Sequence, residues 1–77
     1  RRAIEFYEQW LTIAREIGDR RGEANACWNL GGLLEQQGEL PRAVELMQVA
    51  VDFYSSIGHP RAEGLAAHVA EIRQKLK

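Results

Sequence analysis

The stretch RAIE at residues 2–5 decides the fold, because it returns as RAVE at residues 42–45. The same offset relates Ile17-Gly18 to Ile57-Gly58, and it relates Arg21, Glu23 and Ala26 to Arg61, Glu63 and Ala66. A constant period of this length, with helical patterning inside each copy, is typical of an α-solenoid, in which short helical hairpins stack on their neighbours.

Glycine and proline divide the chain into four segments. Three glycines are evenly spaced along it, at Gly18, Gly38 and Gly58. Each is placed to end a helix, since glycine adopts the left-handed conformation of a C-terminal cap without a Cβ penalty. We expect Asp19 to cap the helix that follows it, and Pro41 and Pro60 to take first helical positions. The predicted fold is all-α, an antiparallel helix-turn-helix α-solenoid with helices near 1–17, 20–37, 41–57 and 60–76.

Apolar residues recur at helical spacing within each segment. The stripe is widest in the first segment, where it consists of Ala3, Ile4, Tyr7, Trp10, Leu11, Ile13, Ala14 and Ile17. It is thinnest in the last, where it consists of Leu65, Ala66, Val69, Ile72 and Leu76. A wide stripe predicts contact with more than one neighbouring helix, and no segment alternates with the period of two that a strand requires.

Composition narrows the function classes. The chain has 77 residues, a net charge of −1 and a single cysteine. A near-neutral chain with scattered arginines argues against nucleic-acid binding, and no apolar run approaches the ~20 residues that cross a membrane. One thiol without a secretion signal favours a cytoplasmic location. No spacing of cysteine and histidine indicates a metal, so we expect no metal and no cofactor.

Residues 24–51 resemble a tetratricopeptide repeat. Leu30 and Gly31 match the Leu-Gly pair of that motif, and Met47 takes its usual aromatic position. Ala43 and Ala50 match its two small residues, which let helices approach closely. The period, longer than that of the usual repeat, resembles the repeats of kinesin light chains, of Leu-Gly-Asn-repeat G-protein modulators and of bacterial signalling proteins.

The resemblance covers the whole chain and implies a division of it. Residues 1–77 form a single fragment of a solenoid, and 1–17 correspond to the second helix of one repeat. Residues 20–57 correspond to a complete repeat, and 60–76 to the first helix of the next repeat or to a capping helix. Two departures stand out: Trp10 occupies the position that Ala50 has one period later, with Gly31 and Gly32 as the residues expected to leave it room, and the Leu-Gly pair becomes Ala70-Glu71 in the last segment.

The resemblance also implies a binding surface, because the first helix of each tetratricopeptide repeat lines a concave groove. The residues at groove positions are Asn25, Trp28, Asn29, Gly32, Glu35, Leu65, His68 and Ile72. Asn29 stands where family members often use asparagine to hold the main chain of a peptide. The alternative for Trp28 is packing against the next helix. Basic residues that hold a C-terminal carboxylate in chaperone-binding members are missing from these positions.

Catalytic chemistry finds no support in the sequence. His59 and His68 are the only histidines, and no phosphate-binding glycine loop is present. Cys27 lies on an apolar stripe, which favours a small core residue, and His59 fits a turn. Arginine pairs at 1–2 and 20–21 have acidic residues within a helical turn, so we expect local ion pairs there.

The sequence therefore predicts a non-enzymatic scaffold that binds a protein or peptide partner, and neither nucleic acid nor a membrane. One alternative is a regulatory or sensor segment of a larger signalling protein, such as an ATPase or transcription factor. Another is a homo-oligomerisation module. The apolar surface of helix 1–17 is too wide for one neighbour to cover, so we expect self-association through that helix.

Overall fold

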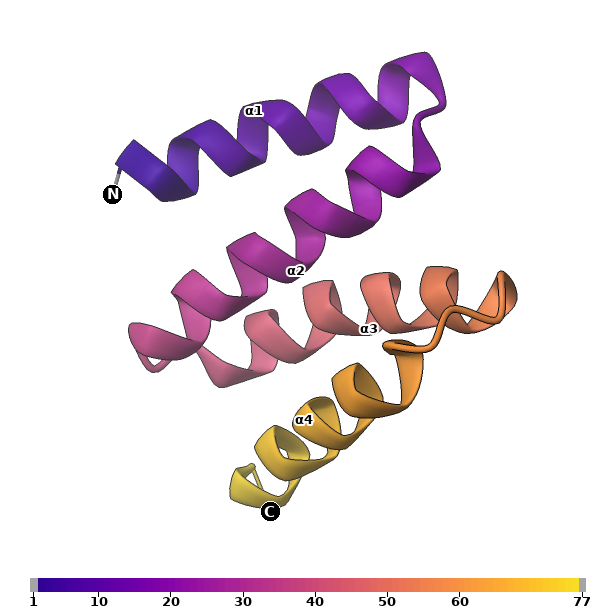
Figure 1. Cartoon of the computed structure of the whole chain (residues 1–77). Helices are drawn as coiled ribbons and strands as arrows, with labels where there is room; N and C mark the ends of the chain where they lie inside the picture. The colour runs from indigo at the N-terminus through magenta and orange to yellow at the C-terminus, as the bar shows by residue number, and fades with distance from the viewer. Residues whose placement is uncertain (1, 77) are drawn as a thin grey trace.

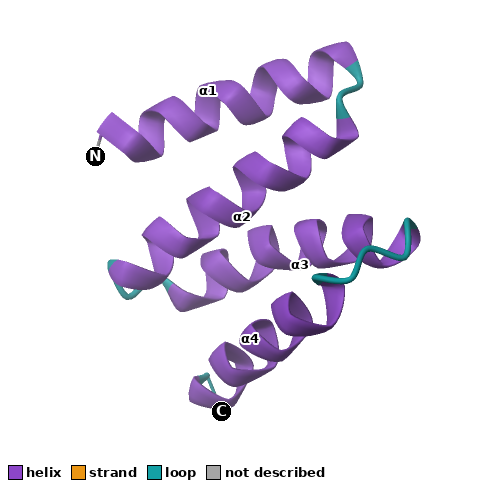
Figure 2. Ribbon diagram, viewed as in Figure 1, coloured by secondary structure: helices purple, strands orange, loops and turns teal. Residues whose placement is uncertain are grey.

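The computed structural model describes residues 2–76 and consists of four helices that follow one another in an antiparallel arrangement (Figure 1). Helix α1 spans Arg2–Ile17, α2 spans Arg20–Gln36, α3 spans Leu40–Ser56 and α4 spans Ala62–Lys75. Each helix packs on its neighbours in the chain, so α2 lies between α1 and α3, and α3 between α2 and α4. Helices and loops make up residues 2–76, with no strand among them (Figure 2), which confirms the all-α helical-hairpin fold.

The helix boundaries agree with the predicted ranges to within one or two residues, apart from residue 1, which lies outside the described part of the chain. The largest difference is at α4, which begins at Ala62. Pro60 lies in a turn before the helix, where the Ala62 N–H donates to the His59 carbonyl at 3.0 Å and the Arg61 N–H donates to His59 Nδ1 at 3.1 Å. Pro60 is therefore not the first helical residue, and His59 is the turn residue that the sequence predicts.

The joints after α1, α2 and α3 have the same hydrogen-bond geometry. Gly18, Gly38 and Gly58 have φ values of 74°, 83° and 66°, as a left-handed cap requires. The residue after each glycine donates its N–H to a carbonyl five residues earlier, at 2.8–2.9 Å in all three joints. Asp19 also caps α2, because its Oδ1 accepts from the Gly22 N–H at 2.9 Å.

Helices α2 and α3 approach each other closely at the small residues that the repeat motif provides. Ala43 and Ala50 are 0% exposed. A Cβ added to Gly31 would lie 2.6 Å from Met47 Cγ and 3.1 Å from the Ala43 carbonyl oxygen. No side chain fits there without displacing α3, so glycine and alanine at these positions set the distance between the two helices.

The ends of the molecule are less buried than their apolar stripes predict. In α1 only Leu11 and Ala14 are buried, since α2 is the helix that covers α1. Trp10 does not lie against Gly31 and Gly32, where the sequence predicts room for it; it stands beside Asn25 and Ala26 and is 47% exposed. The core of α4 consists of Ala62, Leu65, Val69 and Ile72, whereas Ala66 and Leu76 are exposed.

Charged residues pair differently from the sequence prediction. The observed Arg–carboxylate bridges join Arg15 to Glu23 at 3.0 Å and Arg42 to Glu8 at 2.8 Å. Among the described residues neither Arg2 nor the pair at 20–21 forms a salt bridge, and the Arg20 guanidinium instead lies 5.7 Å from the ring centre of Phe53. Exposed pairs of this kind contribute about 0–1 kcal/mol, so packing holds the helices together.

Candidate functional site

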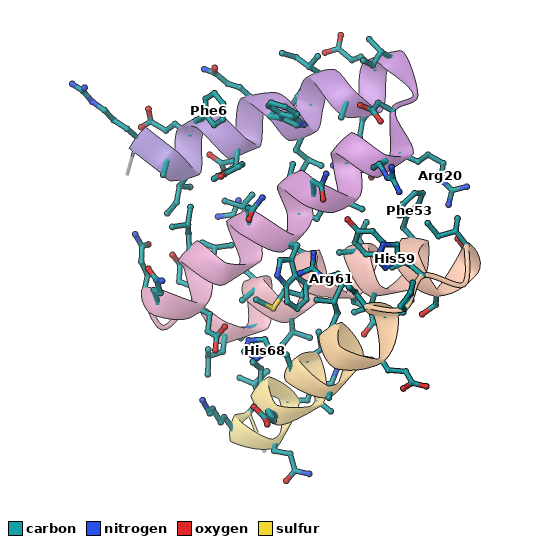
Figure 3. The ribbon with its side chains drawn as sticks, in the orientation of Figure 1. Phe6, Arg20, Phe53, His59, Arg61 and His68 are labelled. Carbon is teal, nitrogen blue, oxygen red and sulfur yellow. The ribbon has the colours of Figure 1, made fainter. Side chains whose placement is uncertain are left out.

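Side chains from three helices surround a small polar hollow. Its lining consists of Asn25, Trp28 and Asn29 of α2, Tyr54 of α3, Arg61 and Leu65, and its volume is about 200 Å³. Arg61 immediately precedes α4, and Figure 3 shows its side chain extending toward α2. The hollow exists because α4 packs on α3 and leaves the side of α2 that bears Asn25 and Asn29 open.

Asn25 is oriented by a hydrogen bond from α3. The Tyr54 hydroxyl donates to Asn25 Oδ1 at 2.7 Å. Because the carbonyl oxygen of this carboxamide is engaged, its two N–H groups are the ones left to donate to a ligand. Asn29, one helical turn further along α2, is exposed. The surface thus presents one oriented carboxamide and one freely accessible carboxamide.

A second set of side chains joins α2 to α4 next to the hollow. His68 Nε2 lies 2.8 Å from Glu35 Oε1, a distance at which the imidazole N–H donates to the carboxylate. The His68 ring also stands edge-to-face on Trp28, with 5.8 Å between the ring centres. These contacts fix Trp28 in a half-buried position, where it both packs against the core and borders the hollow. Trp28 therefore packs against the core, as one interpretation of the sequence expects, whereas its contact with a partner stays a prediction.

A further hollow of about 280 Å³ adjoins the first on the side of α1. It is lined by Phe6, Tyr7, Trp10, Asn25, Ala26 and Asn29. Asn25 and Asn29 line both hollows, so they stand at the centre of a band that crosses α1, α2 and the start of α4. A band of this kind offers consecutive shallow sites rather than one enclosed cavity.

Most of the residues predicted at groove positions fall in this region. Asn25, Trp28, Asn29 and Leu65 line the polar hollow, Glu35 and His68 pair beside it, and Gly32 is half-buried with open space where a Cβ would stand. Ile72 is a correction: it is 0% exposed, because α4 turns this residue into the core shared with α3. A fully buried side chain offers no surface to a partner.

Six residues of the band are not among the predicted site residues: Phe6, Tyr7, Trp10, Ala26, Tyr54 and Arg61. Arg61 follows Pro60 at the start of the fourth segment and matches Arg21 one period earlier, so its position could be found from the repeat alone. In the sequence, Trp10 is a misfit in the repeat and a member of the wide apolar stripe of the first segment. Tyr54 left no signal in the sequence, since its role depends on a hydrogen bond across two helices.

The chemistry of the band favours oxygen ligands. Arg61 forms no salt bridge with a described residue, and its guanidinium adds to the N–H groups of Asn25. Donors on one surface select carbonyl or carboxylate oxygens on the other. Within residues 2–76, His, Cys, Asp and Glu side chains nowhere gather in a group of three or more that could hold a metal ion.

Cys27 stands apart from this site. It is 0% exposed on the far side of α2, among Leu11 and Ala26, which confirms the prediction of a small core residue. Burial raises the pKa of the Cys27 thiol above its ordinary value; Arg15 opposes the effect and Glu23 adds to it. The thiol is therefore held in its neutral form at physiological pH.

The fold defines the chain as a helical-hairpin repeat. No family model matches the chain. No solved structure matches it. Human G-protein-signaling modulator 1 is similar to the chain: the two are 45% identical over 47 residues, which is 61% of this chain and 7% of the modulator. The match therefore covers a small part of that relative, and it agrees with the resemblance to G-protein modulators that the repeat motif indicates.

None of the four helices in residues 2–76 combines the length and the apolar character that crossing a membrane requires.

Proposed function

We propose that the chain is a non-enzymatic protein-interaction module that holds an extended peptide along the band centred on Asn25 and Asn29. The observation that supports this best is the oriented carboxamide of Asn25: this residue lines the polar hollow, its oxygen accepts from Tyr54, and its N–H groups are left to donate. An extended peptide has a carbonyl at every residue, so such a donor binds its main chain whatever its sequence.

The size of the hollows favours a peptide over a small molecule. The two have volumes of about 200 and 280 Å³, whereas sites for small molecules enclose roughly 300–1,000 Å³. Each hollow accommodates one side chain of a peptide whose main chain crosses Asn25 and Asn29. Trp28 and Trp10 provide the apolar contact, and Arg61 favours an acidic or polar side chain at the α4 end.

The similarity to a G-protein-signaling modulator supports a role in signalling. In this proposal the chain is part of a tetratricopeptide array, with residues 20–57 as a complete repeat. The second candidate is a regulatory segment of a larger signalling protein, in which the peptide held by the band belongs to the same polypeptide. Both candidates require the same surface, and they differ in whether the bound peptide comes from another protein.

Selection from a displayed library of random linear peptides tests the proposal. The probe is the peptide most enriched on the wild-type chain, and its affinity is then measured by fluorescence anisotropy. We expect Asn25→Ala and Asn29→Ala each to weaken binding by roughly 5–30-fold, the loss of about 1–2 kcal/mol in hydrogen bonding. The helical circular dichroism signal stays unchanged, because Asn29 is exposed and Asn25 makes one part-buried hydrogen bond.

The matched control is Gln37→Ala, which removes an exposed carboxamide at the end of α2, away from both hollows. Equal binding by wild type, Asn25→Ala and Asn29→Ala would contradict the proposal, as would selected peptides that lose affinity equally with Gln37→Ala.

A further inference from the structure

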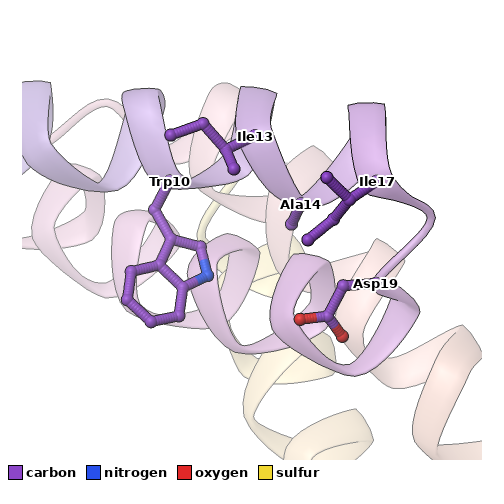
Figure 4. A pocket seen from close by; sticks show the side chains of 5 residues that line it. All are labelled: Trp10, Ile13, Ala14, Ile17 and Asp19. Atoms are coloured by element: carbon purple, nitrogen blue, oxygen red, sulfur yellow. The ribbon is translucent and has the colours of Figure 1, made fainter.

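One face of α1 exposes most of the large apolar side chains of that helix. Phe6, Trp10, Ile13 and Ile17 are 55%, 47%, 57% and 71% exposed. Figure 4 shows Trp10 hanging from α1 with Ile13, Ala14, Ile17 and Asp19 beside it, around a hollow of about 190 Å³. We call the exposed side chains of Phe6, Trp10, Ile13 and Ile17 the α1 face.

The internal repeat shows what kind of surface the α1 face is. The offset that relates RAIE to RAVE places Phe6, Trp10 and Ile13 on Leu46, Ala50 and Phe53 of α3. These are residues through which α3 packs on α2: Leu46 lies against Ala26 and Cys27, Ala50 is fully buried, and Phe53 lies under Arg20. The α1 face is therefore the side of the helix that, one repeat later, is covered by the preceding helix.

The same offset identifies an open counterpart on α4. Cys27, Leu30 and Leu34, which α2 buries between its neighbours, correspond to Ala67, Ala70 and Gln74. In α4 these residues line a shallow open hollow of about 580 Å³, together with Glu71 and Lys75. We call this surface the α4 face. It lies on the side of α4 that points away from α3, since the buried residues of α4 are Ala62, Leu65, Val69 and Ile72.

We propose that the α1 face of one copy packs on the α4 face of a second copy, in the arrangement that joins α3 to α2 within the chain. The sizes of the side chains complement each other. Inside the chain, small Ala50 meets the helix that bears Cys27 and Leu30; between copies, large Trp10 meets the helix that bears Ala67 and Ala70. The side chains are smaller on α4 than at the same positions of α2, and the side chain that meets them is larger on α1 than at the same position of α3.

The area available sets the strength of this contact. Side chains of this size bury about 150–250 Å² each, so the exposed fractions leave roughly 400–500 Å² of apolar surface on the α1 face. A matched area on α4 brings the total to about 800–1,000 Å², at or just below the lower limit of about 1,000 Å² for a specific interface. We therefore expect weak association. The contact joins two different surfaces, so each added copy leaves one face of each kind open, and chains of copies grow with concentration.

The α4 face is separate from the polar hollow, since none of its residues lines that hollow. On the α1 face, Phe6 and Trp10 also line the second hollow of the band, so a bound peptide and a second copy contact the same two side chains. The association of α1 with α4 differs from the symmetric alternative, in which two α1 faces pair with each other and growth stops at a dimer. The two arrangements respond differently to a change in α4, and that difference is the basis of the test.

Two variants each block one face. Ile13→Glu places a carboxylate on the α1 face, and Ala70→Glu places one on the α4 face; both positions are exposed, so the fold tolerates them. The controls are Thr12→Glu on α1 and Ser55→Glu on α3, which add the same charge at exposed positions outside the two faces. Circular dichroism confirms that all four variants are folded.

Sedimentation velocity between about 10 and 500 μM, a range that brackets weak interfaces, measures the result. We expect the wild type and both controls to grow beyond the dimer with concentration, and each blocked variant to sediment as the 8.7 kDa monomer. An equimolar mixture of the two blocked variants forms a dimer and nothing larger, because it contains one intact face of each kind.

Three outcomes overturn the proposal. The first is a wild type that stays monomeric over the whole range. The second is dimerisation of Ala70→Glu alone, which would show pairing of α1 with α1. The third is a mixture of folded blocked variants that does not associate.

Discussion

Helices α1 and α3 occupy the same position in successive repeats, yet the structure buries them to different degrees. Six residues of α3 are buried, against two of α1. Their sequences begin almost identically, with RAIE and RAVE. The difference lies in the neighbours, since α3 packs between α2 and α4 whereas α1 packs on α2. In a solenoid, a helix obtains its stability from the helices on either side of it rather than from its own sequence.

The largest expected effect on stability comes from exchanging Trp10 of α1 and Ala50 of α3, which occupy the same position in successive repeats. Ala50→Trp forces an indole into a site that is 0% exposed, and we expect it to destabilise the fold by more than about 3 kcal/mol. A chain of 77 residues has a total stability of roughly 4–12 kcal/mol, so this loss removes a large share of it. The reverse change, Trp10→Ala, costs less than about 1 kcal/mol in the monomer, because the side chain is half exposed. Urea denaturation measures the free energy of unfolding of both variants. Equal losses would contradict the difference in burial between α1 and α3.

A smaller change tests the close contact between α2 and α3. Ala43→Leu adds three carbons where Gly31 and Met47 leave no space, and we expect a loss of about 1–3 kcal/mol. Its counterpart one period earlier, Ala3, is exposed on α1, so Ala3→Leu changes stability by less than about 0.5 kcal/mol. An unchanged thermal melting curve for Ala43→Leu would mean that the repeat register is misassigned.

The joints at the two ends of α2 give a third contrast. Asp19 accepts a hydrogen bond from Gly22, whereas Glu39, at the same position before α3, makes no side-chain cap bond. We expect Asp19→Ala to cost about 1 kcal/mol, and Glu39→Ala to cost almost nothing. Equal shifts in the denaturation midpoints of the two variants would show that capping does not distinguish the joints.

The smallest effect concerns the contact between α1 and α2 at high pH. Burial raises the pKa of Cys27 in the folded state, so the unfolded chain loses this proton first. The buried neutral thiol therefore makes its full contribution to the free energy of unfolding below the ordinary thiol pKa of about 8.5. That contribution declines as the pH rises toward the raised pKa of Cys27 in the folded state. We expect the fold to lose stability above the ordinary thiol pKa, and Cys27→Ala to remove the dependence. The melting temperature of both chains from pH 7 to pH 10 measures it; parallel curves would contradict the assignment.

The sequence predicted the internal geometry of the repeat better than its ends. Glycine caps, the Asp19 cap and the approach at Ala43 follow from local chemistry, which a sequence displays directly. The burial of Trp10 depends on which helix covers α1, and the sequence of α1 does not contain that information. The exposure of the α1 side chains therefore depends on which helices pack beside α1.

The residues of the candidate site also divide into those that the repeat motif predicts and those that depend on contacts between helices. Asn25, Trp28 and Asn29 were found from their position in the repeat motif, and they line one hollow. Ile72 was misplaced because the motif assigns it to the groove, whereas α4 packs with that residue facing α3. The bond from Tyr54 to Asn25 joins residues 29 positions apart, and no helical periodicity connects such a pair.

Hydrogen exchange followed by NMR tests the central comparison most directly, because it reports the stability of each helix separately. The chain is studied at the lowest practical concentration, where it is monomeric. The account predicts that the central amides of α3 exchange only through global unfolding, and that those of α1 exchange at least about tenfold faster, a difference of about 1.4 kcal/mol or more. Equal protection of α1 and α3, or slower exchange in α1, would contradict it.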